Sequence, residues 1–327
     1  MTTQISTDRN AAVELLRAGE LVALPTETVY GLAAEALNPI AVAKIFEAKE
    51  RPKFDPLIVH LPERDWLERV AEVPRQDRQL IETLTAKLWP GPFTIVLPKR
   101  DIIPDLVTAG LETVAIRISA NQVFSETIRA FSKPLAAPSA NRFGRVSPTT
   151  AQHVMDELSG RIPLIIDAGP TEHGIESTIV AVRDGMIDIL RRGPITQEQL
   201  SQFGEVNVDS SAGKISAPGQ LPSHYAPKTP LRLVDDAQEF KGPGRTALLT
   251  WNPISDEKRF VAVRRLSAQQ DLREAATNLF RYLRELDALN VDLIVAERVP
   301  RQGLGAAILD RLERAAHDPA QTPAPLR

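Results

Sequence analysis

The stretch PTETVYGLAAEALNPIAVAKIFEAKERPKFDPLIVHL, from Pro25 to Leu61, decides the fold of the first half of the chain. It continues an apolar strand candidate at residues 21–24. Asn38-Pro39 begins a helix, because Asn is a favoured N-cap and Pro a favoured first helical residue. We expect this helix to run to about Glu50 and a second strand to follow at residues 57–61. Strand, helix and strand in this order predict an α/β sheet.

Lys49 closes an otherwise apolar face of the predicted helix. Val42, Ile45, Phe46 and Lys49 recur at helical spacing, so the lysine ends a buried stripe. One interpretation is that its ammonium reaches water at the helix C-terminus, where it favours the macrodipole. The other interpretation is an anion-binding site, which Arg51 two residues later favours.

Two strand candidates place basic side chains on definite faces, because side chains alternate along a strand. In residues 57–61, Ile58 and His60 share one face, and in residues 113–118, Thr113 and Arg117 share one face. A lone histidine in a strand is more often structural than functional. A buried arginine needs an anion, which is either an internal carboxylate or a substrate carboxylate bound by the guanidinium fork.

A hairpin predicts a second pair of polar neighbours. Residues 178–182 and 186–190 are its arms, and Gly185 can supply the positive φ of its turn. Pairing of the two arms predicts that Ser177 and Arg191 lie close together at the open end.

The small polar residues that follow the apolar residues 135–137 are candidates for phosphate binding. They form the phrase Pro138-Ser139-Ala140-Asn141, and SPTT at 147–150 then begins a helix. Hydroxyls, exposed N–H groups and a helix N-terminus can bind phosphate. The alternative is ordinary capping of the helix by Ser147 or Thr149.

Composition bounds the class of protein. A chain of 327 residues with 43% hydrophobic residues can bury two domain cores. A net charge of −3 predicts no large nucleic-acid surface, and no stretch approaches the roughly 18 apolar residues of a membrane span, so we expect a cytoplasmic protein. The absence of cysteine excludes thiolate chemistry. The sequence also lacks P-loop, GxSxG and HExxH motifs, which leaves cations and hydroxyls suited to holding anions.

Three segments divide the chain. Residues 1–205 are interpreted as a mixed α/β domain, residues 206–230 as a Pro-rich linker, and residues 231–327 as a second domain whose tail is flexible from about residue 317. In the second domain, strand and helix candidates alternate, which predicts a small parallel α/β fold. The strand candidates are 246–251, 260–266 and 291–297, and the helix candidates are 271–289 and 304–316.

Six phrases in order resemble the YrdC/Sua5 family, the threonylcarbamoyl-AMP synthases, whose hallmark is a KxR…SxN signature. They are the Pro25–Leu61 stretch with KER at 49–51, WPGPFTIVL (89–97), PLAAPSANRFGRVSPTTAQHV (134–154) with SAN at 139–141, DAGPTEHGIESTIV (167–180), ILRRG (189–193) and PSHYAP (222–227). The resemblance implies an N-terminal twisted, mixed open sheet with helices. In the longer two-domain Sua5 type it also implies a smaller C-terminal Rossmann-like parallel α/β domain.

The activity that the resemblance implies is that of a nucleotidyltransferase. L-threonine, bicarbonate or CO2, and ATP with Mg2+ give threonylcarbamoyl-AMP and pyrophosphate, without an organic cofactor. The product would pass to a transfer complex that makes N6-threonylcarbamoyladenosine (t6A) at position 37 of tRNA, with direct tRNA contact left open. The HYAP segment of the linker would fold over the site as a lid.

The resemblance also implies a site. The threonine pocket would use Thr28, His60, Arg117, Ala137 and Ser177. The ATP site would use Lys49, Arg51, Asp55, Thr113, Ser139, Asn141, Ser147, Arg191 and Tyr225. Lys49, Arg51 and Arg117 would carry catalysis, with no metal ligand from the protein. Asp55 stands where the family pattern has Asn, and Ser119 stands where it has Pro.

Two other functions compete. A nucleic-acid-binding module would use a basic cleft of the same fold, although the weak overall charge argues against it. A carbamoyl-transfer enzyme of the hydrogenase-maturation type would need a zinc-finger-like region, which a chain without cysteine lacks.

Overall fold

The computed structural model describes residues 1–52, 54–208, 218, 224–242 and 244–317. Contacts divide the chain into two compact units. The first comprises Met1–Phe143 and Ser147–Gln220, and the second comprises Gly144–Val146 and Leu221–Arg327. Much of the predicted linker at 206–230, and the predicted flexible tail beyond residue 317, lie outside the described residues.

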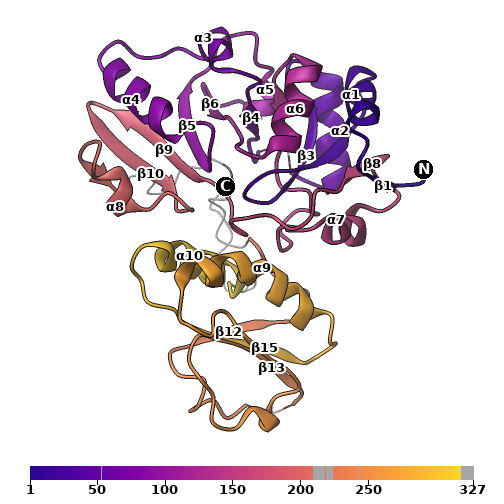
Figure 1. Cartoon of the computed structure of the whole chain (residues 1–327), viewed down its shortest axis with the longest axis vertical. Helices are drawn as coiled ribbons and strands as arrows, with labels where there is room; N and C mark the ends of the chain where they lie inside the picture. The colour runs from indigo at the N-terminus through magenta and orange to yellow at the C-terminus, as the bar shows by residue number, and fades with distance from the viewer. Residues whose placement is uncertain (53, 209–217, 219–223, 243, 318–327) are drawn as a thin grey trace, which may run out of the picture. The chain divides into compact units, whose positions relative to one another are not determined.

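The first unit is built on one mixed sheet, which has eleven strands within the described residues (Figure 1). The strand order is β1 (Gln4–Ser6), β8 (Leu164–Ile166), β2 (Val22–Pro25), β3 (Tyr30–Glu35), β7 (Leu135–Ala136), β4 (Ile58–His60), β6 (Thr113–Arg117), β5 (Phe93–Pro98), β9 (Thr178–Arg183), β10 (Met186–Arg191) and β11 (Val206–Asn207). Parallel pairs such as β4 with β6 and antiparallel pairs such as β5 with β6 both occur. The predicted mixed α/β sheet is therefore confirmed.

Helices cover this sheet unevenly. α1 (Arg9–Arg17) and α6 (Gln122–Phe131) lie side by side and bury Leu16 and Phe124 against one face of the β1 to β7 half (Figure 1). The opposite face carries the larger core. The remaining helices of the unit are α2 (Pro39–Lys49), η1 (Arg64–Trp66), α3 (Leu67–Val70), α4 (Arg78–Leu88), α5 (Asp105–Thr108), α7 (Ala151–Leu158) and α8 (Gln197–Leu200).

The predicted strand faces are confirmed by the cores that their residues join. Leu57, Val59 and Leu61 belong to the larger core, whereas Ile58 joins a small cluster with Ala115. This cluster lies on β4, β6, β5, β9 and β10. Side chains alternate, so His60 and Arg117 share the face of this cluster. Two of the predicted site residues, His60 and Arg117, therefore project from this face.

Helix α2 begins as predicted and ends at Lys49, next to the predicted end at about Glu50. The side chain of Asn38 accepts from the backbone N–H groups of Ile40 and Ala41 at 3.0 and 3.3 Å, and Pro39 opens the helix. At the other end Glu50 adopts a left-handed conformation, with φ of 53°. The chain therefore turns sharply directly after Lys49.

The hairpin has a shorter turn than the sequence suggested. Arg183 pairs with Met186, so the turn consists of Asp184 and Gly185, both with positive φ. Positive φ at both turn residues matches the twist of the flanking strands. Helix α7 also differs in detail, because Thr150, rather than Ser147 or Thr149, is its N-cap and accepts from the N–H of His153 at 3.2 Å.

The second unit contains an all-parallel sheet of four strands in the described ranges, ordered β12 (Leu231–Val234), β15 (Leu293–Glu297), β13 (Thr246–Thr250) and β14 (Val263–Arg265). Helices α9 (Leu272–Asp287) and α10 (Leu304–Ala315) lie on one side of it (Figure 1), and η2 (Glu257–Arg259) precedes β14. The predicted parallel α/β fold is confirmed. The strand predicted at 260–266 is reduced to the three residues that pair with β13, and β12 was not predicted.

Candidate active site

Lys49 is buried and does not reach water. Its side chain is 1% exposed, and its ammonium donates to the carbonyl oxygens of Ser139 and Asn141. Burial lowers the pKa of Lys49 well below its usual value, and the nearby Arg51 charge lowers it further. The interpretation of a lysine that reaches solvent at the helix end is therefore wrong. The ammonium instead joins the KER turn to the SAN segment.

Arg51 holds the loop that follows the helix. Its Nε and Nη2 donate to the carbonyl oxygens of Asp55 and Pro56 at 3.2 and 2.9 Å, and Nη2 lies 2.8 Å from Oδ2 of Asp55. Burial raises the pKa of the Asp55 carboxyl, whereas the positive charges of Arg51, Lys49 and Arg191 lower it. Asp55 is therefore a buried carboxylate within electrostatic reach of three cations.

Arg117 has an internal carboxylate partner. Its Nη2 lies 2.5 Å from Oε1 of Glu27, and its Nη1 donates to the hydroxyl of Thr28 at 3.1 Å. The other oxygen of Glu27 accepts from the hydroxyl of Ser119. Of the two anions that the sequence left open for this arginine, the structure shows the internal one.

His60 lies beside Arg117 on the same face. The two residues are register partners on β4 and β6, and His60 is 2% exposed with its ring 4.6 Å from that of Phe124. Burial lowers the pKa of His60 to about 3, and the Arg117 charge adds to this effect, while Glu27 and a backbone hydrogen bond with Ala137 oppose it. The imidazole is therefore neutral at physiological pH.

The open end of the hairpin brings Ser177 and Arg191 together, as the pairing predicted. Arg191 Nε donates to the carbonyl oxygen of Ser177 at 3.0 Å, and its Nη2 donates to the hydroxyl at 3.0 Å. Ser177 also shares a hydrogen bond of 2.7 Å with the hydroxyl of Thr94. Thr94 is the register partner of Arg117 on the neighbouring strand, so Arg117, Thr94, Ser177 and Arg191 follow one another across the sheet.

Within the described residues, the remaining predicted site residues have fewer contacts with the arginines and the lysine above. Thr113 begins β6, four positions before Arg117, and the N–H of Ala137 donates to the carbonyl oxygen of Ile58 at 3.0 Å. Ser147 is buried, and its hydroxyl contacts Oε1 of Glu176. Tyr225 belongs to the second unit, where it stacks on Phe280 at 5.5 Å.

The sequence did not single out Glu27, Thr94 or Glu176. Each is a buried polar residue that contacts a predicted site residue, namely Arg117, Ser177 and Ser147. One available signal was the buried phrase TETV, where an acidic residue directly before Thr28 requires a partner.

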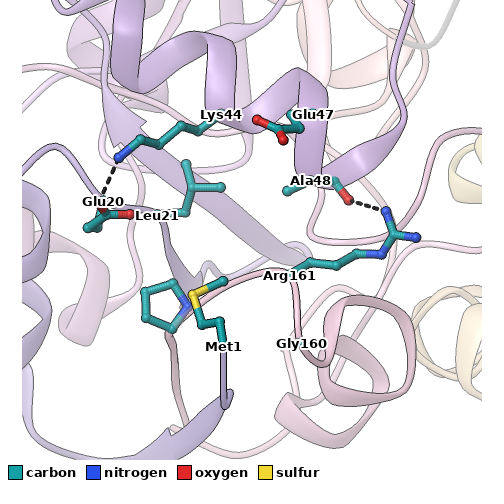
Figure 2. Close-up of a pocket in the computed structure, with 9 residues that line it drawn as sticks. Met1, Glu20, Leu21, Lys44, Glu47, Ala48, Gly160 and Arg161 are labelled. Atoms are coloured by element: carbon teal, nitrogen blue, oxygen red, sulfur yellow. Dashed lines mark hydrogen bonds and ion pairs between the residues drawn. The ribbon is translucent and has the colours of Figure 1, made fainter.

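A pocket of about 490 Å3 lies elsewhere in the first unit (Figure 2). Two cations of its wall are held by neighbours in the same wall: Lys44 Nζ lies 2.7 Å from Oε1 of Glu20, and Arg161 donates to the carbonyl oxygen of Ala48 at 3.3 Å. None of the predicted site residues lines this pocket. It therefore does not mark the predicted site.

The described part of the chain contains neither a candidate metal-binding cluster nor a helix that could span a membrane. No cluster of three or more His, Cys, Asp or Glu side chains is placed there to hold a metal ion. No helix there is both long enough and apolar enough to span a membrane.

A buried histidine makes stability depend on pH. The folded protein keeps His60 neutral down to about pH 3, whereas an unfolded chain protonates it near its usual 6.5. The unfolded state thus binds more protons in this window, and the free energy of unfolding should fall with decreasing pH by up to about 1.4 kcal/mol per pH unit. Urea denaturation between about pH 7 and about pH 5 checks this. His60→Gln should flatten the slope, and an unchanged slope in this variant would contradict the assignment.

Fold and site together define an α/β enzyme that handles anions, because Arg117 and Arg191 lie on one sheet and a buried lysine, Lys49, ends helix α2 of the same unit. The predicted site residues include no evident covalent nucleophile. Residues 14–193 match the family model described as Telomere recombination (Sua5, YciO and YrdC), and residues 195–317 match the C-terminal domain of threonylcarbamoyl-AMP synthase. The chain belongs to the Sua5/YrdC family of threonylcarbamoyl-AMP synthases, in its two-domain form.

Named relatives agree over nearly the whole chain. The threonylcarbamoyl-AMP synthase of Bacillus subtilis is 41% identical, and that of Pyrococcus abyssi is 38% identical; each comparison covers 93% of this chain and 92% of the relative. The crystal structure of P. abyssi Sua5 complexed with L-threonine has a TM-score of 0.83 and 36% identity, covering 94% of both chains. A doubly substituted form of that protein has a TM-score of 0.85 and 33% identity, covering 96% of both chains.

Proposed function

We propose that this chain is an L-threonylcarbamoyladenylate synthase. The amine of L-threonine adds to CO2, supplied as such or from bicarbonate, and loses a proton to become a carbamate. A carbamate oxygen then attacks the α-phosphorus of ATP, and pyrophosphate leaves. The observation that carries the proposal is the row of neighbouring residues from Arg117 through its register partner Thr94 and through Ser177 to Arg191, which brings two guanidinium groups near one another on one sheet.

The amino acid is proposed to bind at the Arg117 end. Arg117 would bind the substrate carboxylate, with Thr28, neutral His60, the backbone of Ala137 and Ser177 around it. A guanidinium suits this task because it offers five N–H donors in a planar fork. The similar P. abyssi Sua5 forms a complex with L-threonine, which supports threonine as the amino acid bound here.

The nucleotide is proposed to bind at the other end. Lys49, Arg51 and Arg191 would neutralise the phosphates, with Asp55, Thr113, Ser139, Asn141 and Ser147 completing the part of the site that the first unit supplies. ATP enters as its Mg2+ complex, so that the ion is part of the substrate and lowers the charge that the protein must neutralise. Catalysis then consists of positioning and charge neutralisation at phosphorus.

Pyrophosphate release tests the proposal. The full chain is given MgATP with L-threonine and bicarbonate, singly and jointly, and L-serine replaces threonine as a control. Release is expected only when both co-substrates are present, and it should be slower with serine. Release that needs neither co-substrate, or none despite ATP binding, would refute the synthase.

The carboxylate of Asp55 is proposed to weaken nucleotide binding. Asp55→Asn removes a negative charge beside the phosphate-binding cations but leaves Arg51 its two backbone acceptors. The Kd of MgATP should therefore fall, by about tenfold, because like charges brought together repel. Calorimetry checks this, with Asp105→Asn, an exposed partner of Lys99, as the control. Weaker binding by Asp55→Asn would mean that the carboxylate contributes a ligand.

The product is proposed to be handed to a tRNA threonylcarbamoyl transfer complex, since a mixed anhydride is activated for group transfer. A cytoplasmic location belongs to the same proposal, because ATP, amino acids and tRNA occur together in the cytoplasm.

A further inference from the structure

Glu27 is a buried acidic residue outside the predicted site. It lies between β2 and β3, is 4% exposed, and is paired on both carboxylate oxygens. Oε1 is 2.5 Å from Nη2 of Arg117, and Oε2 is 2.5 Å from the hydroxyl of Ser119. Its backbone carbonyl accepts from the N–H of His173 at 2.9 Å. Side chain and backbone are therefore both held in place.

These contacts orient Arg117 but use only some of the N–H donors of its guanidinium group. Glu27 uses one N–H of Nη2, and Thr28 accepts one N–H of Nη1 at 3.1 Å. The Nε atom is buried and has no hydrogen-bond partner among the residues that the structure describes. A guanidinium has five N–H donors. Glu27 and Thr28 thus fix its plane while other donors remain for a further anion.

Glu27 also supplies the negative charge that balances the positive charge of Arg117. Burial would raise its pKa, but the charge of Arg117 and the hydrogen bonds from Ser119 and Arg117 lower the pKa to about 2. His60, the neighbouring titratable group on β4, is neutral. Glu27 is therefore the charge that pairs with Arg117, and removal of one partner of a buried ion pair leaves the other charge uncompensated.

We propose that Glu27, held by Ser119, is a positioning residue that orients Arg117 toward the carboxylate of the amino-acid substrate. This rests on the proposed function, because it takes L-threonine as the ligand of Arg117. Glu27 acts through the arginine and does not touch the substrate. The substrate carboxylate would then bind a guanidinium group whose plane is already fixed. A bidentate hydrogen bond requires such a fixed plane. The hydroxyl of Ser119 anchors this arrangement, which a proline at that position would not do.

The test measures pyrophosphate release against threonine and against ATP concentration in the full chain, and threonine binding by calorimetry. Glu27→Gln keeps the size of the side chain but removes its charge. Its KM for threonine should rise about tenfold or more, with kcat and the KM for ATP changing less than about threefold. Ser119→Ala keeps the carboxylate and should raise the same KM about threefold. Asp188→Asn, a buried carboxylate paired with Arg183, is the matched control and should change neither KM.

Each possible result either supports or overturns the positioning role of Glu27. A lowered melting temperature with an unchanged threonine KM in both variants would make Glu27 purely structural and overturn the proposal. A lower threonine KM would also overturn it, because Glu27 would then compete with the substrate. If Glu27→Gln does not fold, Ser119→Ala alone carries the test. Wild-type protein that binds threonine but releases no pyrophosphate refutes the synthase only, and weaker threonine binding by the variants then still supports the positioning role.

Discussion

Replacing Lys49 by methionine should lower kcat/KM for ATP by about a hundredfold or more, because one donor aimed at a developing phosphate charge is typically worth that much. The ammonium donates two of its three N–H groups to the carbonyl oxygens of Ser139 and Asn141. Its third N–H remains for a phosphate oxygen. Methionine keeps an apolar stem of similar size in the buried stripe of α2. Pyrophosphate release at varied ATP measures the effect.

Lys44→Met is the matched control for this prediction. Lys44 lies on the same helix, but its ammonium is partly exposed and pairs with Glu20 at 2.7 Å. An exposed ion pair contributes little, so this variant should retain activity within about twofold. Equal losses in both variants would show that the helix was damaged rather than the site.

Replacing Arg117 by lysine should raise the KM for threonine by about a hundredfold, equivalent to about 2.7 kcal/mol, with little change in the KM for ATP. Lysine keeps the charge but loses the fork that reaches Glu27, Thr28 and a third group at once. Initial rates of pyrophosphate release at varied threonine, with saturating MgATP and bicarbonate, measure this change in KM.

Arg183→Lys serves as the control, since Arg183 is half exposed, lies at the turn end of the hairpin and pairs with Asp188. It should leave both KM values unchanged. If Arg117→Lys raised the KM for ATP instead, the carboxylate would have to bind elsewhere and the proposed division of the site into two ends would be wrong.

Local patterns in the sequence predicted those parts of the site that depend on periodicity. Alternation along residues 57–61 and 113–118 placed His60 and Arg117 on one side of their strands, and hairpin pairing placed Ser177 beside Arg191. Helical spacing identified Lys49 as the end of an apolar stripe. In each case one element and its own geometry suffice, because the period of a strand, a hairpin or a helix is fixed by its backbone.

Partners from distant segments could not be predicted in this way. Glu27 reaches Arg117 across ninety positions of sequence, and Thr94 reaches Ser177 across eighty-three. Strand order decides these contacts, and strand β3 was itself missed because YGLAAE is buried on almost every residue and shows no alternation. The burial of Lys49 was also beyond local pattern, since it depends on the SAN segment that covers the lysine.

A threonylcarbamoyladenylate synthase joins threonine, one carbon from bicarbonate and AMP into a single molecule. The most direct measurement is the mass of the adenylate formed from L-threonine and MgATP with ordinary and with carbon-13 bicarbonate. The expected product is threonylcarbamoyl-AMP, which is heavier by one carbon-13 when labelled bicarbonate is used. An adenylate whose mass does not change with the label, such as threonyl-AMP, or AMP alone, would contradict the proposed function.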